Sequence, residues 1–375
     1  MKMLFLIYHG FEEYNGISKK IKYQMEAFRK CGFTTHVCYL TDQQMHKRRW
    51  IDDYVIKDYG DTFKAKILKR IDFKSIVDYV KREGISFVYV RHDHNANPFT
   101  IYLYRQLQKC GCKIALEIPT YPYDMEYQGF PFSECLNLFV DQRFRKRMAH
   151  YVDCIVTFSA LNEIWGRETV QISNGIDFDQ IPMKKHYHTT DNVINLMAVA
   201  EIHYWHGLDR VLKGLVKYYK ESPQTTVMFH IVGEPGEKDR EEMLEIIQNG
   251  HIEKYVIFYG RKHGAELDGL FEKADMGIGS LGRHRSGITN IKTLKNREYA
   301  ARGIPFTYSE TDEDFDNMPY VLKIMPDESP VNIHDLIDFY QSKTWTPQSI
   351  RDSVGHLSWT KQMSKVVDKI KETQR

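Results

Sequence analysis

Short apolar segments alternate with longer amphipathic segments along nearly the whole chain, and this alternation restricts the possible folds more than any other feature. The apolar runs have the length of buried strands, and the amphipathic segments have the length of helices. The first half predicts strands at residues 2–8, 34–40, 86–90, 113–118, 154–158 and 170–173, and helices at 17–31, 73–83, 98–109 and 139–150. Strands that alternate with helices in this way predict βαβ units and a parallel sheet.

The alternation stops at residues 178–191 and then starts again. This segment is polar, contains a proline and shows no clear period, so it is the best candidate for a linker. The second half predicts strands at residues 193–200, 226–232, 256–259, 276–280 and 304–308, helices at 208–220, 237–248 and 264–273, and a further helix that ends at Gly303. A chain of 375 residues is also too long for one ordinary core.

The predicted fold class is therefore α/β, with two Rossmann-like, doubly wound domains that face each other across a cleft. The expected parts are an N-terminal domain at residues 1–178, a linker at 179–191, a C-terminal domain at 192–346 and a helical tail at 347–375. The tail carries apolar residues at helical spacing, so we expect it to dock back on the N-terminal domain. Ligands of such folds bind at the carboxyl ends of the strands.

Several common catalytic and ligand-binding signatures are missing from the sequence. The first glycine loop, residues 9–16, and residues 232–236 both differ from GxGxxG, and no GxxxxGK[ST], HExxH or GxSxG occurs. Dehydrogenases, P-loop NTPases and serine hydrolases are therefore disfavoured. No DxD signature follows a strand and the six cysteines show no CxxC spacing, so we expect neither a metal nor a cofactor.

Composition predicts a cytoplasmic protein. No apolar run approaches the ~20 residues that a membrane span needs, and the first strand is too short for a secretion signal. The net charge of +2 comes without the dense basic patch of a nucleic-acid binder. Basic residues at 143–147 and 64–74 predict peripheral contact with the anionic inner face of the cell membrane, although scattered solvated charges explain them equally well.

Three segments at the expected carboxyl edges carry residues suited to phosphate binding. In residues 15–20, Gly16 would let a phosphate approach a helix N-terminus, which a plain helix start explains equally well. In residues 201–210, His206 can donate to a phosphate, although a histidine beside a tryptophan is more often packed in the core. Residues 281–290 form a basic, glycine-rich loop that leads into a helix and can cradle a diphosphate.

Glu298 lies in the helix that follows this basic loop. It shares one helical face with Ile291, Leu294 and Ala301, and we expect that face to be buried. A carboxylate on a buried apolar face can accept hydrogen bonds from vicinal hydroxyl groups, such as those of a ribose. The alternative is a salt bridge to Lys295, three residues earlier.

Taken in order, the motifs resemble those of GT-B retaining glycosyltransferases of glycosyltransferase family 4. The matching pieces are the Gly16 loop, Val156-Thr-Phe-Ser159, Ile172-Ser-Asn-Gly-Ile-Asp177, His206-Gly207, Ile231-Val-Gly233, Val256-Ile-Phe-Tyr-Gly260 and the run from Leu294 to Pro305. Two further segments resemble a polysaccharide-biosynthesis branch, namely Pro119-Thr-Tyr-Pro-Tyr-Asp124 and Trp205-His-Gly-Leu-Asp-Arg210.

The resemblance implies roles for residues of the C-terminal domain. Glu298 matches the second glutamate of the family's E-x7-E motif, which holds the donor ribose, and the first glutamate falls on Asn290, which would meet the donor sugar. The family's diphosphate clamp falls on Glu201 and His206, so an arginine, Arg285 in preference to Arg283, would supply the missing charge. The expected catalytic residues are His206, Asn290 and Glu298, and the expected donor-binding residues are Gly16, Gly233, Arg261, Arg285, Lys295 and Glu298.

The acceptor is expected on the N-terminal domain. The family's histidine near the donor sugar falls on Pro119, so Glu117 or Thr120 would take its role. The expected acceptor-binding residues are Arg91, Glu117, Thr120, Tyr121 and Asp124. Each of them equally suits a structural polar residue with satisfied hydrogen bonds.

The implied activity is a metal-independent hexosyltransferase that acts in surface polysaccharide biosynthesis. It would move a sugar from a nucleoside-diphosphate sugar, with a UDP-sugar as the expected donor, to a hydroxyl of a glycan or lipid-linked acceptor. The anomeric configuration would be retained, because the departing phosphate takes the acceptor proton on the same face. Two alternatives remain: a GT-B relative such as a nucleotide-sugar epimerase or phosphorylase, and a catalytically weak scaffold subunit.

Overall fold

The structure is a computed structural model that describes residues 1–11, 16–43, 46–127, 131–185 and 192–372. The chain divides into two compact units. The N-terminal unit comprises Met1–Ser173 and Trp359–Arg375, and the C-terminal unit comprises Asn174–Ser358. The chain thus divides after residues 173 and 358. The prediction instead ended the N-terminal domain at residue 178, began the C-terminal domain at residue 192 and began the tail at residue 347.

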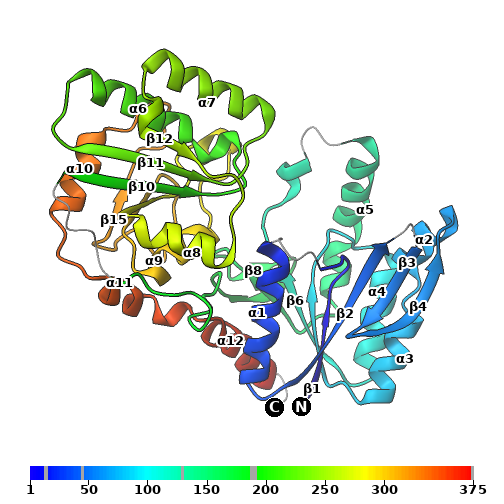
Figure 1. The fold of residues 1–375 in the computed structure, drawn as a ribbon. Coiled ribbons are helices and arrows are strands. Elements are labelled where there is room, and N and C mark those ends of the chain that lie inside the picture. Colours follow the sequence, from blue (N-terminus) through cyan, green and yellow to red (C-terminus); the bar gives the residue numbers. More distant parts are fainter. Residues whose placement is uncertain (12–15, 44–45, 128–130, 186–191, 373–375) are drawn as a thin grey trace. The chain divides into compact units, whose positions relative to one another are not determined.

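The described strands of the N-terminal unit form one nine-stranded sheet (Figure 1). Its order is β4 (Tyr54–Gly60), β3 (His46–Ile51), β2 (Thr34–Gln43), β1 (Lys2–Leu6), β5 (Phe87–Arg91), β6 (Lys113–Ile118), β7 (Cys154–Thr157), β9 (Arg167–Gln171) and β8 (Glu163–Ile164). The strands from β2 to β9 pair in parallel, as predicted. Antiparallel pairs extend both edges.

Helices cover both faces of this sheet. They are α1 (Gly16–Lys30), α2 (Phe63–Ile71), α3 (Lys74–Glu83), α4 (Pro98–Lys109), α5 (Phe132–Ala149) and α12 (Trp359–Glu372). Successive strand residues face opposite sides. Leu4 and Val88 pack with α3, α4 and α5, whereas Phe5 and Tyr89 pack with α1 and α12.

The last helix, α12, completes the core of the N-terminal unit. Trp359, Met363, Val366 and Ile370 recur at helical spacing and are buried beside α1. The expectation that the C-terminal helix docks on the N-terminal domain is confirmed.

The hairpin of β3 and β4 and the helix α2 were not predicted. The inward-facing positions of β3 include Lys47 and Arg49, which are buried charged residues and not apolar ones. Arg49 is accommodated because its Nη2 donates to the carbonyl of Lys69 over 2.7 Å and its Nε donates to the hydroxyl of Tyr59 over 3.2 Å. A strand of this kind has no apolar signal in the sequence.

The described strands of the C-terminal unit form one parallel sheet of six. Its order is β12 (Val256–Phe258), β11 (Thr226–Val232), β10 (Val193–Val199), β13 (Met276–Ile278), β14 (Phe306–Tyr308) and β15 (Val321–Lys323). The core on one face includes residues of α6 (Leu208–Lys220), α7 (Glu237–Gly250) and α10 (Ile333–Gln341). The core on the other includes residues of α8 (Gly264–Lys273), α9 (Leu294–Arg302) and α11 (Pro347–Ser353).

Element boundaries differ from the prediction at a few places. Helix α5 begins at residue 132, where residue 139 was predicted, and β14 begins two residues later than predicted. Strand β15 and helix α10 were not predicted. Among the described residues, no helix has both the length and the apolar character to cross a membrane.

Candidate functional site

The carboxyl edge of the C-terminal sheet contains a topological switch point between β10 and β13. The strands β11 and β12 lie on one side of β10, and β13, β14 and β15 lie on the other. The crevice at such a point is where open α/β sheets bind ligands. The segments that leave this edge include the 3-10 helices η2 (Tyr204–His206) and η4 (Arg283–Ser286) and residues 309–312.

A glycine allows η2 and η4 to approach each other closely. Gly207 has a φ of +64°, and a Cβ on it would lie 2.7 Å from backbone atoms of Leu281 and Gly282. The N–H of Leu281 donates to the carbonyl of His206 over 2.9 Å. A side chain at position 207 would therefore push the two loops apart.

Gly233, predicted to bind the donor, is also required by packing. Its φ is +127°, and a Cβ on it would lie 1.7 Å from the carbonyl oxygen of Ala200. Its N–H donates to the carbonyl of Gly260 over 2.8 Å. The glycine thus holds together the loops after β10, β11 and β12, and its contact with a donor stays a prediction.

Four ionisable side chains gather at the switch point: His206, Arg283, Lys295 and Glu310. We call them the switch-point cluster. Lys295, in the first turn of α9, donates from Nζ to the Oγ of Ser280 over 3.3 Å. Glu310 follows β14 and is 2% exposed. Within the described residues, neither of its carboxylate oxygens has a hydrogen-bond partner on another residue, and the buried Nε of Arg283 has none.

Burial shifts the pKa values of the charged members of the cluster. Burial raises the pKa of Glu310, although Lys295 and Arg283 oppose the change. Burial lowers the pKa of Lys295, an effect that Glu310 opposes and Arg283 reinforces. Burial also lowers the pKa of Arg283. Perturbed groups around one crevice are typical of functional sites.

His206 is neutral and carries its proton on Nε2. Its Nδ1 accepts a hydrogen bond of 3.0 Å from the backbone N–H of His203, so Nδ1 is the unprotonated nitrogen. Burial lowers the pKa of His206, and the positive charges of Lys295 and Arg283 lower it further. The imidazole therefore offers one neutral N–H donor.

The switch-point cluster is suited to a ligand that carries both anionic and hydroxyl groups. Lys295 and Arg283 attract anions, and His206 supplies a donor to an anionic oxygen. An ionised Glu310 can only accept hydrogen bonds, so it needs a donor such as a hydroxyl. Buried charged groups without partners destabilise a fold, and a bound ligand of this kind would supply the missing partners.

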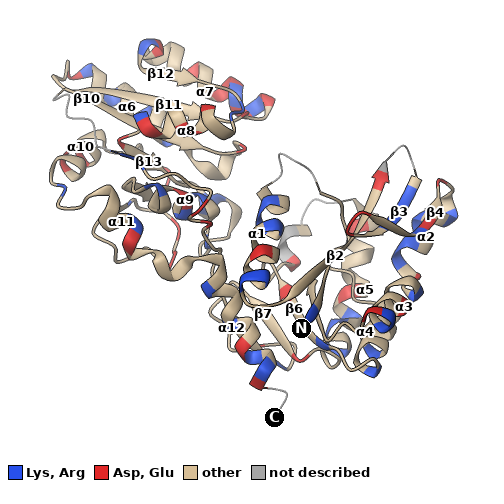
Figure 2. Cartoon of the chain, turned by 60° about the horizontal axis from the view of Figure 1, so that its bottom comes forward, with Lys and Arg blue, Asp and Glu red and all other residues tan. Residues whose placement is uncertain are grey.

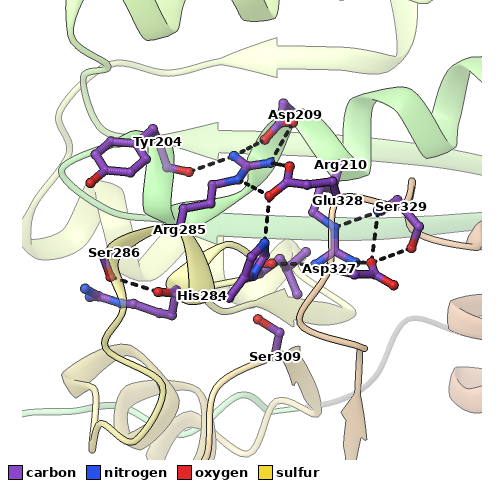
Figure 3. A network of polar contacts seen from close by, with 12 residues as sticks. Tyr204, Asp209, Arg210, His284, Arg285, Ser286, Ser309, Asp327, Glu328 and Ser329 are labelled. Atoms are coloured by element: carbon purple, nitrogen blue, oxygen red, sulfur yellow. Dashed lines mark hydrogen bonds and ion pairs between the residues drawn. The ribbon is translucent and has the colours of Figure 1, made fainter.

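Arg285, predicted to compensate a diphosphate, is occupied by other groups (Figure 3). Its Nη1 donates to the carbonyl of Tyr204 over 2.9 Å and to Asp209 over 2.8 Å. Its Nη2 and Nε contact Asp209 and Glu328 at 2.5–3.1 Å. Hydrogen bonds to Glu328 and Asp209 raise the pKa of Arg285. Contact of Arg285 with a diphosphate stays a prediction, and Arg283, whose buried Nε has no hydrogen-bond partner among the described residues, is the second candidate.

A second arginine, Arg210, fixes the loop that carries Arg283 (Figure 3). Its side chain is buried, and Nη1 donates to the carbonyl of Leu281 over 2.5 Å. Further contacts are to the carbonyls of Ser329 over 2.8 Å and Met325 over 3.0 Å and to the carboxylate of Asp327 over 2.9 Å. Because Leu281 lies two residues before the start of η4, Arg210 positions the start of this loop.

The face of α9 that carries Glu298 is not the buried one. Leu294 on this face is 42% exposed, and Glu298 is half-buried. Its Oε1 accepts hydrogen bonds of 3.1 and 2.9 Å from Arg302, and not from Lys295. The predicted apolar stripe is therefore fully buried at Ala301 but not at Leu294, and the alternative of an ion pair with Lys295 is wrong. Contact between Glu298 and a ribose stays a prediction.

Asn290 lies on an exposed segment before α9. The backbone around it pairs with Thr311: Thr311 N–H donates to Thr289 over 2.7 Å, and Ile291 N–H donates to Thr311 over 3.0 Å. Asn290 is therefore placed next to the segment that carries Glu310. Its contact with a donor sugar stays a prediction.

The buried face of α9 carries an ion pair that the sequence did not indicate. Arg297 contacts Asp312 through two hydrogen bonds of 2.5 and 3.0 Å. It also donates to the carbonyl of Thr293 over 3.0 Å and to that of Asn174 over 3.1 Å. Because Asp312 follows Glu310 by two residues, this pair fixes the loop after β14 on α9.

Arg261, predicted to bind the donor, lies near Glu201 at a distance of 4.0 Å, and both side chains are exposed. This is the geometry of a surface ion pair, which contributes little to stability. Arg261 therefore remains available to a ligand, and its role stays a prediction.

Gly16 is the first residue of α1 and is exposed. A Cβ on it would meet no atom within 4 Å, so packing does not require glycine here. Asn15, which precedes it, lies outside the described residues. The predicted phosphate contact of Gly16 stays a prediction.

Glu117, expected to face the acceptor, is buried inside the N-terminal unit. It accepts hydrogen bonds of 2.6 Å from Tyr89 and from Gln24, and a short one from Arg91. Burial alone would raise its pKa, but Lys20 and Arg91 outweigh this effect, so the pKa of Glu117 is lowered. Arg91 and Glu117 thus belong to a buried network inside the N-terminal unit, and their contact with an acceptor stays a prediction.

The other residues expected to bind the acceptor lie after β6. Asp124 accepts two hydrogen bonds of 2.7 and 3.0 Å from Arg145. The half-buried ring of Tyr121 lies 6.1 Å from the ring of Trp165. Thr120 is half-buried and lies two residues after Ile118, the last residue of β6. Contact of these side chains with an acceptor stays a prediction.

An aromatic cluster that the sequence did not indicate surrounds Tyr121. The ring of His94, which follows β5, stacks on Tyr123 at 3.8 Å. Its Nδ1 lies 2.7 Å from the hydroxyl of Tyr127. Burial lowers the pKa of His94 to about 4, so the ring is neutral near neutral pH. Trp165 joins the cluster edge-on, 6.2 Å from Tyr123.

The sequence thus singled out His206 and Lys295 of the switch-point cluster but did not indicate Glu310 or Arg297, and the binding roles of His206 and Lys295 stay predictions. One signal was available for Glu310, since it directly follows a buried strand, where ligand-binding side chains of α/β folds lie. Nothing in the sequence separates Arg297 from a surface arginine. Among the described residues, no group of three or more His, Cys, Asp or Glu side chains is placed to hold a metal ion.

Comparisons with known proteins establish the fold. No family model and no curated protein matches the chain. Sucrose-phosphate synthase from Thermosynechococcus elongatus matches with a TM-score of 0.63 and 13% identity, over 99% of both chains. Lipopolysaccharide outer core galactosyltransferase WaaB has the same score and identity over 100% of both chains. Anabaena HepE, in complex with UDP and glucose, matches with a TM-score of 0.61 and 12% identity, over 99% of this chain and 100% of its own. The chain has the two-domain GT-B fold that the sequence predicted.

Proposed function

We propose that this protein is a glycosyltransferase that moves a sugar from a nucleoside-diphosphate sugar to an acceptor hydroxyl. The switch-point cluster carries the proposal, because it offers cations and a neutral donor beside an unpaired carboxylate. A UDP-sugar is the expected donor. Support comes from Anabaena HepE, whose structure holds UDP and glucose, and from pneumococcal O-GlcNAc transferase GtfA, whose structure holds UDP and GlcNAc.

Residues of the C-terminal unit bind the donor in this proposal. Lys295 and Arg283 neutralise the diphosphate, and the Nε2–H of His206 donates to one of its oxygens. The half-buried carboxylate of Glu298 binds the ribose, and Asn290 lies near the sugar, as the resemblance implies.

The proposed reaction breaks the bond between the anomeric carbon and the diphosphate and forms a bond from that carbon to the acceptor oxygen. The acceptor proton passes to the departing phosphate on the same face, so the configuration is retained. Negative charge grows on the diphosphate in the transition state, and the fixed charges of Lys295 and Arg283 stabilise it there. The proposed reaction needs no bound metal, because these side chains supply the positive charge.

The proposed acceptor is a glycan or a lipid-linked oligosaccharide in surface polysaccharide biosynthesis. The half-buried rings of Tyr121 and His94, which pack on the buried Tyr123 and Trp165, support a sugar acceptor, because flat aromatic faces pack against the C–H faces of sugar rings. An epimerase or phosphorylase would use the donor site without this second site. Incubation of the donor without an acceptor distinguishes these reactions, because only an epimerase would convert the free donor sugar.

Thermal melting with matched nucleotides tests the donor site. UDP, GDP and ADP and their common sugar conjugates are added to the wild type, to Lys295→Met and to the matched control Lys262→Met, whose side chain makes a surface pair with Glu266. Lys295→Met should weaken binding by about tenfold to 150-fold, the range for a lost hydrogen bond to a charged group. The control should bind as the wild type does. If no nucleotide raises the wild-type melting temperature, the proposed function is wrong.

We further propose that the protein works in the cytoplasm as a peripheral protein on the inner face of the membrane. Helix α5 presents Phe132, Leu136 and Phe139, which are 83%, 51% and 65% exposed, on one helical face. The same face continues with the exposed cations Arg143 and Arg147. Exposed apolar residues combined with cations favour the interface of an anionic bilayer.

Helix α2 supports the same proposal from a second position in this unit. Phe63 and Ile67 are exposed, and Lys64, Lys66 and Arg70 lie among them. Figure 2 shows lysine and arginine residues along α2 and the adjacent strands β3 and β4.

Sedimentation with liposomes tests the membrane contact. The wild type should sediment with vesicles of anionic lipid at low salt and stay in solution with neutral vesicles. The double variant Phe132→Ser, Phe139→Ser should lose most of this binding. Met325→Ser, which removes an exposed apolar residue from the C-terminal unit, is the control. Equal sedimentation with anionic and neutral vesicles would refute the proposal.

A further inference from the structure

We infer that Glu310 is the residue that recognises a hydroxyl group of the transferred sugar, and so makes the site prefer the sugar nucleotide over the bare nucleotide. This inference rests on the proposed function, because it assigns one residue of the same site to one part of the donor. Neither the sequence motifs nor the resemblance pointed to this residue.

Glu310 differs from the other buried acids of the chain. Asp312 is paired with Arg297, Asp275 accepts hydrogen bonds from the backbone and side chain of Asn195, and Glu117 is satisfied as described. Among the buried acids that the structure describes, Glu310 has both carboxylate oxygens buried without a hydrogen-bond partner on another residue, and its own backbone N–H is the one group that favours the charged form at short range. A buried acid with only a structural role has its lone pairs filled by the protein.

The surroundings of Glu310 define the chemistry of its missing partner. The positive charges of Lys295 and Arg283 lower the pKa of Glu310. Among the described residues, however, neither side chain is close enough to its carboxylate to form an ion pair. A phosphate would bring further acceptors and a like charge, so it is a poor partner for Glu310. A hydroxyl brings the hydrogen-bond donor that an acceptor-only carboxylate needs.

The backbone on both sides of Glu310 is fixed, so the carboxylate is held in place before a ligand arrives. Ser309 N–H donates to the carbonyl of Ser280 over 2.9 Å, and Thr311 pairs with residues 289–291. Two residues later, Asp312 is fixed by Arg297. A fixed acceptor discriminates between ligands with and without a hydroxyl, because no loop has to become ordered on binding.

Two parts of the proposed donor carry hydroxyl groups, namely the sugar and the ribose. Matched ligand pairs separate them, because the ribose is present in both members of a pair and the sugar in only one. Dissociation constants are measured by calorimetry for UDP and UDP-glucose, GDP and GDP-mannose, and ADP and ADP-glucose. The proteins are the wild type, Glu310→Gln and Glu310→Ala. Glu313→Gln removes an exposed charge from the same loop and is the matched control.

Glu310→Gln should weaken binding of the sugar nucleotide by about tenfold or more, the effect of one hydrogen bond to a charged group. Binding of the bare nucleotide should stay the same or become tighter, because a negative charge beside the diphosphate is removed. Glu310→Ala should likewise weaken binding of the sugar nucleotide but not of the bare nucleotide, and Glu313→Gln should change the binding of neither. A merely structural role would change both ligands alike.

Other outcomes would overturn the inference. Equal weakening of both members of a pair would mean that Glu310 contacts the ribose or has a merely structural role, and unchanged binding of both would remove it from the site. If the wild type binds no pair at all, the proposed function fails and the inference fails with it. A wild type that binds a pair while Glu310→Gln shows no split refutes the inference alone.

Discussion

Replacing Arg297 with methionine should destabilise the C-terminal unit strongly. The guanidinium is 1% exposed and holds Asp312 through hydrogen bonds of 2.5 and 3.0 Å. Among the described residues, Asp312 would keep long hydrogen bonds of 3.3 Å from Asn296 and 3.4 Å from the N–H of Asp314. The variant therefore leaves a buried carboxylate without a counter-charge, which is the costly way to break a buried ion pair.

The expected loss follows from this geometry. Removing one partner of a buried pair costs about 3–5 kcal/mol. For a unit of this size, each kcal/mol lowers the melting temperature by about 2–4 °C. The unit should therefore melt about 6–20 °C lower in Arg297→Met, as followed by calorimetry. The double variant Arg297→Met, Asp312→Leu should recover part of the loss, because the fully buried charge of Asp312 is gone, while Asp314, the other carboxylate that Arg297 contacts, remains.

A surface arginine supplies the control for this experiment. Arg240 is exposed and pairs with Glu234 over 3.1 Å, so Arg240→Met should leave the melting temperature nearly unchanged. The reasoning would be refuted by an Arg297→Met variant that melts like the Arg240→Met variant, or by a double variant less stable than the single one.

Two further predictions concern the switch point. Gly207→Ala should destabilise the C-terminal unit by more than the ~1–3 kcal/mol of a left-handed backbone, because its Cβ would also lie 2.7 Å from Leu281. Gly264→Ala, with a φ of +55° but no atom within 4 Å of the Cβ, should show only the backbone effect in denaturant titrations. In Lys295→Met, Glu310 remains with its raised pKa, so the folded state holds a proton that the unfolded state releases. The free energy of unfolding should therefore fall as pH rises from the ordinary pKa range of a carboxyl group to the raised pKa of Glu310. In Glu310→Gln, stability should fall as pH drops from the ordinary lysine range through the lowered pKa of Lys295. Slopes of the same sign in urea titrations between about pH 5 and 9 would contradict the assigned shifts.

The parallel core of both sheets was predictable because its strands are continuous apolar runs between helices. The edge of the N-terminal sheet formed by β3 and β4 was not predictable. Strand β3 directs Lys47 and Arg49 inward, and their burial depends on contacts with distant residues, such as that of Arg49 with the carbonyl of Lys69. The C-terminal helix was predictable as a docked segment, since Met363 and Val366 recur at helical spacing.

The candidate site was predictable only in part. Position after a strand identified His206, and the motif around α9 identified Lys295. Helical periodicity chose the wrong face for Glu298, because the buried face of α9 carries Arg297 and Asn296, whose polarity hides their burial. Glu310 was missed because an unpaired buried carboxylate can be recognised only once its neighbours are placed.

The return of α12 to the N-terminal unit sets the order in which the chain can mature during synthesis. The C-terminal unit is one continuous segment, so it can fold as soon as residue 358 has left the ribosome. The N-terminal sheet is synthesised first, yet the α1 face keeps Phe5 and Tyr89 without their final cover until Met363, Val366 and Ile370 emerge. We therefore expect the nascent chain to need protection from aggregation longest at its earliest-made half, and a stop codon before residue 359 to release a protein with that apolar face uncovered.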